Sequence, residues 1–122
     1  MVIPDAGDIA WVEFDPVRGT EQAGRRPALV LTDRIFHEAA RRALVCPITR
    51  TVRAWPSNVL LPPGMKTAGV ILTDQIRAVD LAQRLFDIIE KAPDEVMAAT
   101  RLKLAALLGI DIPLASQGLE RM

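Results

Sequence analysis

Short apolar runs, separated by turn-forming residues, occupy the chain as far as residue 89. Runs of this kind, several of them alternating with polar positions, are typical of β-strands. They predict strands at residues 8–14, 28–31, 43–48, 58–61, 69–79 and 85–89, the third interrupted by Pro47. The run at 28–31 is apolar throughout, which indicates a strand buried on both faces. The polar residues 33–42 predict a connection with room for one helical turn.

The pattern changes after Ala92. Pro93 suits the first position of a helix, the acidic residues 94 and 95 suit its positive end, and Gly109 suits the residue that follows it. Residues 93–108 therefore predict one helix that is apolar on more than one side, so one side is expected to pack on the sheet and another to meet a partner subunit. Residues 110–122 are expected to form a loose tail.

Several strands without intervening helices, followed by one helix, predict a mainly β fold with a C-terminal helix. The arrangement is that of a small, closed or half-closed antiparallel barrel, and it argues against a parallel βαβ sheet. The 122 residues are half hydrophobic, which is enough for one domain with a core. We place that single domain at residues 1–109.

The composition indicates where the protein works in the cell and argues against a metal site and a reactive cysteine. No run is apolar enough to cross a membrane, and no signal-peptide pattern is visible. Cys46 is the only cysteine, which fits a reducing, cytoplasmic setting, and it is expected to be a buried, inert thiol. Cys46 and the only histidine, His37, are too far apart in sequence to indicate a metal site. His37 is expected in a loop without a catalytic duty, and Trp11 in the core.

The formal net charge is zero, but the charges are unevenly distributed. Residues 1–24 hold five acidic residues and one basic residue, a net of −4. Residues 25–77 hold nine basic and three acidic residues, a net of +6, and residues 78–122 have a net of −2 from five basic and seven acidic residues. A local positive field attracts a polyanion whatever the total charge is, so the middle of the chain is compatible with nucleic acid.

Chemically useful side chains gather first in the loop at residues 19–27, which contains Glu21, Gln22, Arg25 and Arg26 before Pro27. A carboxylate and a guanidinium on one loop suit acid–base work at a phosphate-like centre. A solvated loop with a surface ion pair would have the same composition. Two further polar groups follow later strands, and the three groups can converge on one rim of a small barrel: Thr49, Arg50 and Thr51, then Asp74, Gln75, Ile76 and Arg77.

At these positions the chain resembles the MazF/PemK-type toxins. The resemblance covers about residues 5–109 and rests on the segments 7–16 and 19–27, with weaker support from 47–49 and 74–77. It implies an SH3-like barrel of the MazF, CcdB and Kid kind that forms a homodimer. It also implies a sequence-specific endoribonuclease that needs no metal or other cofactor and acts on single-stranded RNA, and a cognate MazE-like antitoxin whose tail blocks the RNA groove.

The resemblance assigns catalytic roles to Arg26, Thr49 and Glu21. Some members carry an arginine two positions before the aspartate of the last segment, where this chain has Leu72, so more weight falls on Arg26. The 2′-hydroxyl of RNA is the nucleophile, which predicts 2′,3′-cyclic phosphate and 5′-hydroxyl ends. Glu21 either takes the proton of that hydroxyl or orients Arg26.

Further residues are expected to contact RNA, with a solvated surface role or a cross-strand pair as the competing interpretation of each: Gln22, Arg25, Arg50, Arg53, Asp74, Gln75 and Arg77. Lys66 could also hold a phosphate, and Trp55 could stack on a base or pack at the rim of the core. Two other functions stay open at this point. One is a toxin on the same barrel that poisons DNA gyrase by binding it, and the other is an RNA-binding dimer without catalysis.

Overall fold

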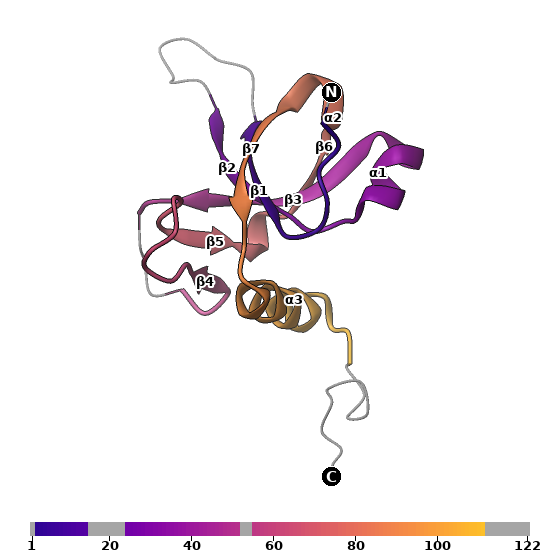
Figure 1. Ribbon diagram of the computed structural model, residues 1–122. Helices are drawn as coiled ribbons and strands as arrows, with labels where there is room; N and C mark the ends of the chain where they lie inside the picture. Colours follow the sequence, from indigo (N-terminus) through magenta and orange to yellow (C-terminus); the bar gives the residue numbers. More distant parts are fainter. Residues whose placement is uncertain (1, 15–23, 52–54, 112–122) are drawn as a thin grey trace.

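The computed structural model describes residues 2–14, 24–51 and 55–111 of the chain (Figure 1). Within these residues the chain forms the strands β1 (Asp8–Glu13), β2 (Arg25–Val30), β3 (Arg42–Thr49), β4 (Asn58–Leu60), β5 (Val70–Leu72), β6 (Arg77–Asp80) and β7 (Leu85–Lys91). The helices are α1 (Arg34–Ala40), α2 (Leu81–Arg84) and α3 (Asp94–Leu108), with a 3₁₀ turn, η1 (Thr73–Gln75). The mainly β class with a C-terminal helix is confirmed.

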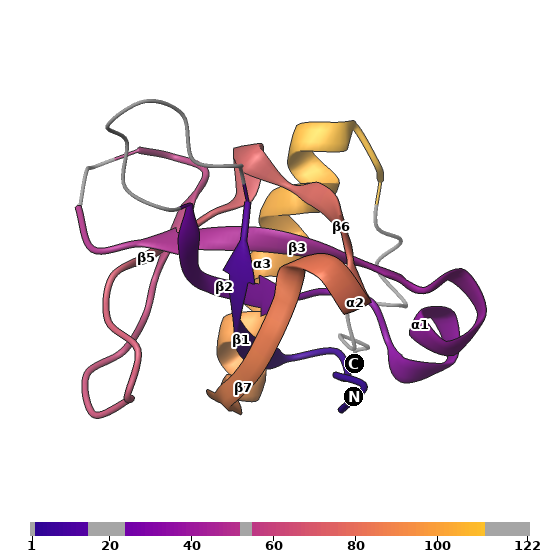
Figure 2. The ribbon, with the colours of Figure 1, turned by 90° about the horizontal axis from the view of Figure 1, so that it is seen from above.

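All strand pairs are antiparallel, in the order β4-β5-β3-β2-β1-β7, with β6 on the first part of β3. The ladder does not close, because β4 and β7 each have one neighbour in this order. Figures 1 and 2 show the strands curving around each other while α3 lies against one end of the sheet. The fold is therefore barrel-like and half-closed.

Strand β3 is the spine of the sheet. One edge pairs with β2, and the other edge pairs with β6 at residues 42–45 and with β5 at residues 48–49. Pro47 lies where β6 has ended and β5 has not begun, so this edge loses no ladder hydrogen bond to the proline. This change of partner explains how a proline is accepted inside a central strand.

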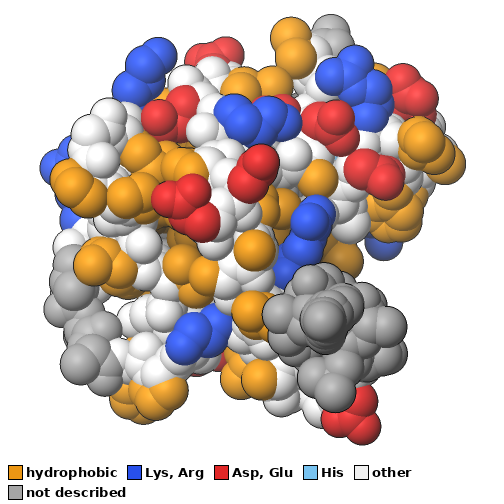
Figure 3. Space-filling view, turned by 60° about the horizontal axis from the view of Figure 1, so that its bottom comes forward, with side chains coloured by type: hydrophobic (Ala, Val, Ile, Leu, Met, Phe, Trp, Pro, Cys, Tyr) orange, Lys and Arg blue, Asp and Glu red, His pale blue; other side chains and the backbone are white. Residues whose placement is uncertain are grey.

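Two apolar clusters lie on the two faces of the central strands. Ile9, Leu29, Cys46 and Ile48 belong to one, which Val96, Met97 and other residues of and before α3 cover. The alternate positions form the other cluster, against β6, α2 and β7: Ala10, Val12, Phe14, Ala28, Val30, Ala43, Val45, Val79, Leu81 and Leu85. One side of α3 packs on the sheet as predicted, and Leu102, Leu107 and Leu108 on the same helix are exposed. Figure 3 shows the face around this helix, where hydrophobic side chains are interspersed with charged ones.

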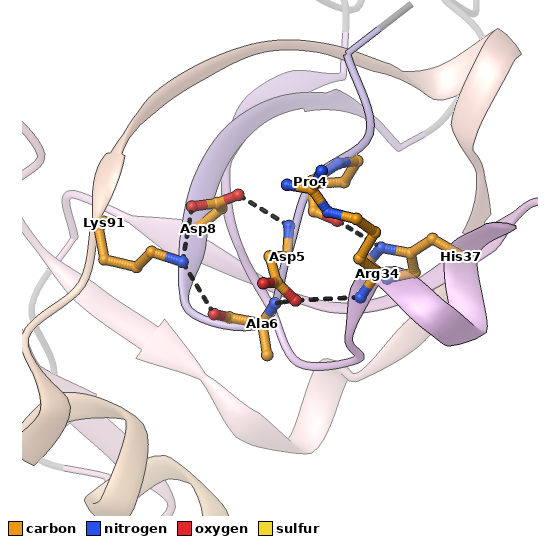
Figure 4. A network of polar contacts seen from close by, with 7 residues as sticks. All are labelled: Pro4, Asp5, Ala6, Asp8, Arg34, His37 and Lys91. Atoms are coloured by element: carbon orange, nitrogen blue, oxygen red, sulfur yellow. Dashed lines mark hydrogen bonds and ion pairs between the residues drawn. The ribbon is translucent and has the colours of Figure 1, made fainter.

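A cluster of polar contacts fixes the start of the chain to α1 and β7, and we call it the N-terminal anchor (Figure 4). Asp8 forms an ion pair with Lys91 at 3.1 Å and accepts a hydrogen bond from the Asp5 backbone N–H at 2.8 Å. Asp5 in turn accepts hydrogen bonds from the backbone N–H groups of Ala6 and Arg34 at 2.9 and 3.0 Å. The Arg34 and Ala6 hydrogen bonds lower the pKa of Asp5 below its ordinary value.

His37 completes the N-terminal anchor from α1, and its predicted loop position was wrong. Its side chain is fully buried, with Nδ1 2.8 Å from the Pro4 carbonyl and Nε2 2.7 Å from the Thr32 hydroxyl. The carbonyl can only accept, so Nδ1 donates, and in the neutral ring Nε2 accepts from Thr32. The same hydroxyl accepts the Leu44 backbone N–H at 3.1 Å. His37 is thus a buried structural residue that joins three segments.

Other local predictions also need correction. Within residues 33–42, Arg34–Ala40 form a helix of two turns, and the Asp33 side chain caps it by accepting the Phe36 N–H. The predicted strand at 69–79 is divided into β5, η1 and β6. Thr73 is buried there and donates to the Ser57 carbonyl at 2.6 Å, which holds the turn between the two strands. Trp11 is not in the core but is 39% exposed.

Candidate functional site

A cavity of about 430 Å³ lies at one end of the central strands. Strand β2 begins at Arg25 and β3 ends at Thr49, so both residues lie at the same end of this antiparallel pair. The residues that line the cavity come from four strands and two loops: Trp11, Arg25, Arg26, Pro27, Ile48, Thr49, Arg50, Thr51, Lys66, Thr67, Ala68 and Ile89. Neighbouring strand positions face opposite sides, so a cavity that borders both members of such pairs lies at the strand ends rather than over one face.

Arg26 and Thr49 lie at the same end of β2 and β3, and both line the cavity. The last pair of the β2–β3 ladder at this end is Ala28 with Pro47, and Arg26 and Thr49 lie two residues beyond it on their strands. The guanidinium and the hydroxyl are therefore brought to one cavity despite their separation in sequence.

Two contacts set the position of Thr49. Its Oγ1 accepts the Thr51 backbone N–H at 3.2 Å, so the hydroxyl hydrogen can be donated to another group. Gly69 packs directly against its carbonyl, and a Cβ on Gly69 would overlap the Thr49 oxygen. Gly69 also has a φ of +123°, a conformation that side chains rarely adopt. Glycine at this position thus allows the loop before β5 to lie against the end of β3.

The loop between β4 and β5 forms one wall of the cavity. The Glu90 carboxylate on β7 accepts the backbone N–H groups of Lys66 and Thr67 at 3.2 and 2.7 Å. Burial raises the pKa of Glu90, but the Thr67 side chain and these two N–H groups lower it, and the net shift is downward. Glu90 is therefore ionised at neutral pH and fixes this wall to the far end of the sheet.

The lining is cationic. Its described residues include Arg25, Arg26, Arg50 and Lys66 and no carboxylate. Guanidinium groups keep their charge at any working pH and donate several hydrogen bonds in a planar fork that suits phosphate oxygens. The cavity can thus bind a phosphodiester and stabilise negative charge that develops on it.

Four of the predicted site residues meet at this cavity, namely Arg25, Arg26, Thr49 and Arg50. The others are placed elsewhere or lie outside the described residues. Asp74 and Gln75 are exposed on η1 and do not line it. Glu21, Gln22 and Arg53 fall outside the residues that the structure describes.

Arg77 lies on β6, opposite Val45, and so projects to the face of the sheet that Arg26 and Thr49 share. Its guanidinium is 5.3 Å from the centre of the Phe14 ring and 3.4 Å from the Phe14 carbonyl. The structure therefore gives Arg77 a packing contact within the fold, and it is not a lining residue of the cavity.

Sequence reasoning missed one residue that lines the cavity, Trp11, and one that supports its wall, Glu90. Trp11 was expected in the core but is partly exposed. Strand alternation gave no clear signal, because Glu13 and the fully buried Ile9 both share its parity. No signal marked Glu90 either, because its partners are backbone N–H groups in a loop 23 and 24 residues away.

Three other observations bound the chemistry. Cys46 is buried, as predicted, and its burial, with a smaller effect of Asp74, raises the pKa of the thiol to about 12, so it is not a nucleophile. Among residues 2–14, 24–51 and 55–111, no three histidine, cysteine or acidic side chains are grouped to hold a metal ion. No helix within the same ranges is long and apolar enough to span a bilayer.

Comparison with known proteins agrees with this geometry. Residues 5–108 match the family described as PemK-like, MazF-like toxin of type II toxin–antitoxin system. The chain belongs to this family. The resemblance predicted from residues 5–109 is thereby confirmed.

This MazF-like toxin is also similar to individual named proteins of the family. It is 36% identical to the endoribonuclease toxin MazF of Escherichia coli K12 over 110 residues, and this alignment covers 88% of this chain and 96% of that protein. It is also 36% identical over 101 residues to endoribonuclease EndoA of Bacillus subtilis 168, covering 79% and 86%. A crystal structure of MazE-MazF from Deinococcus radiodurans superposes with a TM-score of 0.84 at 38% identity, over 91% of this chain and all of that one.

Proposed function

We propose that this MazF-like toxin is an endoribonuclease that cleaves single-stranded RNA at a specific sequence without a metal ion. The observation that carries the proposal is that Arg26 and Thr49 both line one cavity, together with three further cationic side chains. The names of its relatives supply the reaction class, since MazF, PemK and EndoA are endoribonucleases. None of the described residues that line the cavity favours the gyrase-poisoning alternative.

In the proposed reaction, the 2′-hydroxyl attacks the neighbouring phosphorus, and the bond from phosphorus to the 5′-oxygen breaks. Arg26 donates to the non-bridging oxygens, whose negative charge grows in the transition state, and Thr49 donates one more hydrogen bond. The 2′-hydroxyl gives up its proton, the departing 5′-oxygen takes up a proton, and the products carry a 2′,3′-cyclic phosphate and a 5′-hydroxyl. Glu21 remains the proposed base or the residue that orients Arg26.

The cavity also offers contacts for the flanking nucleotides. The partly exposed indole of Trp11 supplies a flat apolar surface on which an unpaired base can stack. Arg25 and Arg50 supply charge for neighbouring phosphates. Gln22, Arg53, Asp74, Gln75 and Arg77 remain proposed RNA contacts that lie outside this cavity or outside the described residues.

The partners follow from the same assignment. We propose a MazE-like antitoxin as the inhibitor, in line with the MazE-MazF complex from Deinococcus radiodurans. We also propose a homodimer, and the exposed leucines of α3 offer apolar surface for it. A cytoplasmic location fits a protein that acts on messenger RNA.

The test is incubation of the purified protein with a long single-stranded RNA in the presence of a chelator. Defined fragments with cyclic phosphate ends are expected, and mapping those ends identifies the recognised sequence. A substrate with a 2′-deoxy sugar at the mapped site should survive, because its nucleophile is missing; cutting of that substrate would refute the mechanism. Trapping of gyrase without RNA cleavage would refute the function.

A further inference from the structure

The Glu90 carboxylate joins two regions at opposite ends of the open sheet. It lies on β7, the last strand at one end, and its partners lie in the loop at residues 61–69 that connects β4 and β5 at the other. Each carboxylate oxygen accepts one N–H: Oε1 that of Lys66 and Oε2 that of Thr67. Two hydrogen bonds to an ionised acceptor, from adjacent residues, fix both the position and the orientation of this segment.

The loop projects from the sheet, so this support matters. Its base is closed by the hydrogen bond from the Leu61 N–H to the Gly69 carbonyl at 2.9 Å. Near its tip, a Cβ on Gly64 would have open space on all sides within 4 Å. Between base and tip, Lys66 and Thr67 line the cavity, and these are the residues that Glu90 holds.

We infer that Glu90 is a positioning residue for nucleic-acid binding: it holds the Lys66 backbone at the wall of the cavity, so that the Lys66 ammonium can receive a phosphate next to the scissile one. This inference rests on the proposed function and extends it to one further subsite. Lys66 is exposed, and its charge adds to those of Arg25 and Arg26 across the same cavity. The phosphate is that of a single-stranded RNA backbone.

The direction in which RNA affinity changes when Glu90 is removed distinguishes a positioning role from a purely electrostatic one. Glu90 is an acid close to a surface that binds a polyanion, so removal of its charge alone would strengthen RNA binding. Loss of positioning would weaken binding, because Lys66 would no longer be held at the cavity. Asp87 is a matched control, since it is an exposed acid on the same strand.

The first experiment measures the positioning without RNA. Amide hydrogen exchange in wild type, Glu90→Ala, Glu90→Gln and Asp87→Ala should show faster exchange at Lys66 and Thr67 in the two Glu90 variants only. Glu90→Gln should be intermediate, because its single carbonyl oxygen accepts one of the two N–H groups. Unchanged exchange at both residues in Glu90→Ala would overturn the inference, whatever the protein does with RNA.

The second experiment measures binding to an oligoribonucleotide with a 2′-deoxy sugar at the mapped cleavage site. Lys66→Ala and Glu90→Ala should each weaken binding, by about fivefold, and reduce the salt slope by about 0.7. The double variant should bind no worse than Lys66→Ala, because the two residues act through one contact. Tighter RNA binding by Glu90→Ala, or losses of affinity that add in the double variant, would overturn the inference, and cleavage by the wild type would still support the proposed function. A wild type that neither binds nor cuts RNA would contradict the proposed function itself.

Discussion

The N-terminal anchor and the cavity use similar side chains in opposite ways. In the anchor the polar groups satisfy one another: Asp8 pairs with Lys91, Asp5 accepts two backbone N–H groups, and both ring nitrogens of His37 have partners. In the cavity the described lining holds four cations and no carboxylate. Polar groups that satisfy one another stabilise a fold, whereas charge of one sign gathered at a cavity is arranged for a ligand.

The largest effect that tests this contrast between the anchor and the cavity is expected for Arg26→Ala. We expect RNA cleavage to fall by about 10²- to 10³-fold, as when one transition-state donor is removed, with a change in unfolding free energy within about 0.5 kcal/mol. Arg26→Lys should restore only part of the rate, because the planar fork is lost. Arg101→Ala, an exposed arginine on α3, is the control; equal rates in both alanine variants would remove the cavity as the active site.

The next effect concerns the support of the cavity. Gly69→Ala would force a Cβ into the Thr49 carbonyl, and we expect a loss of about 3 kcal/mol in stability together with reduced cleavage. Gly64→Ala also has a positive φ but meets no neighbour within 4 Å, so about 1 kcal/mol is expected there, without loss of cleavage. Urea unfolding and single-turnover cleavage measure both variants. Equal losses in the two would mean that backbone strain alone matters at Gly69.

A substitution in the N-terminal anchor should lower stability and leave the cleavage rate unchanged, which is the reverse of the effect expected for Arg26→Ala. His37→Ala leaves the buried Pro4 carbonyl and Thr32 hydroxyl without their partner, and we expect a loss of about 2–4 kcal/mol in unfolding free energy. The cleavage rate per folded molecule should be unchanged below the melting temperature. Glu38→Ala, exposed on the same helix, should have little effect on either. A fall in the rate of folded His37→Ala would couple the two regions.

The smallest effect is a loss of stability in acid. The pKa values of Asp5 and Glu90 are both lowered in the fold, so the stability that they contribute is complete above their ordinary values of 3.8 and 4.5. It disappears as the pH falls through the lower folded values. The free energy of unfolding, measured with denaturant, should therefore decrease less steeply from about pH 6 to pH 2 in Asp5→Asn than in wild type. Identical slopes would contradict the role of Asp5 in the anchor.

Much of the architecture could be predicted because it depends on local patterns. Apolar runs placed the strands, and Pro93, Asp94 and Gly109 marked the last helix, whose bounds agree within one residue. The break of residues 69–79 could not be predicted, because it depends on the hydrogen bond from Thr73 to Ser57, which is distant in sequence. The same holds for α1, whose cap at Asp33 is local but whose buried His37 depends on Pro4.

The site divides in a similar way. Arg26 and Thr49 could be singled out because each lies at the end of an apolar strand, and the antiparallel pairing of β2 with β3 brings these two strand ends to one side of the sheet. Asp74 and Gln75 were expected on a strand that would bring them to the same rim, and the 3₁₀ turn places them away from the cavity. Lys66 was named as a possible phosphate contact, but its support by Glu90 was not predictable, since the two are joined by backbone contacts that leave no residue pattern.

The pairing of β1 with β7 has a consequence for synthesis of the toxin. The second strand to border β1 is β7 at residues 85–91, so the first strand of the described chain pairs with the last one to be made. Lys91 likewise reaches Asp8 only at that stage. Contacts between such distant segments form late in folding. The sheet around β1 therefore cannot be completed before residues 85–91 have been made.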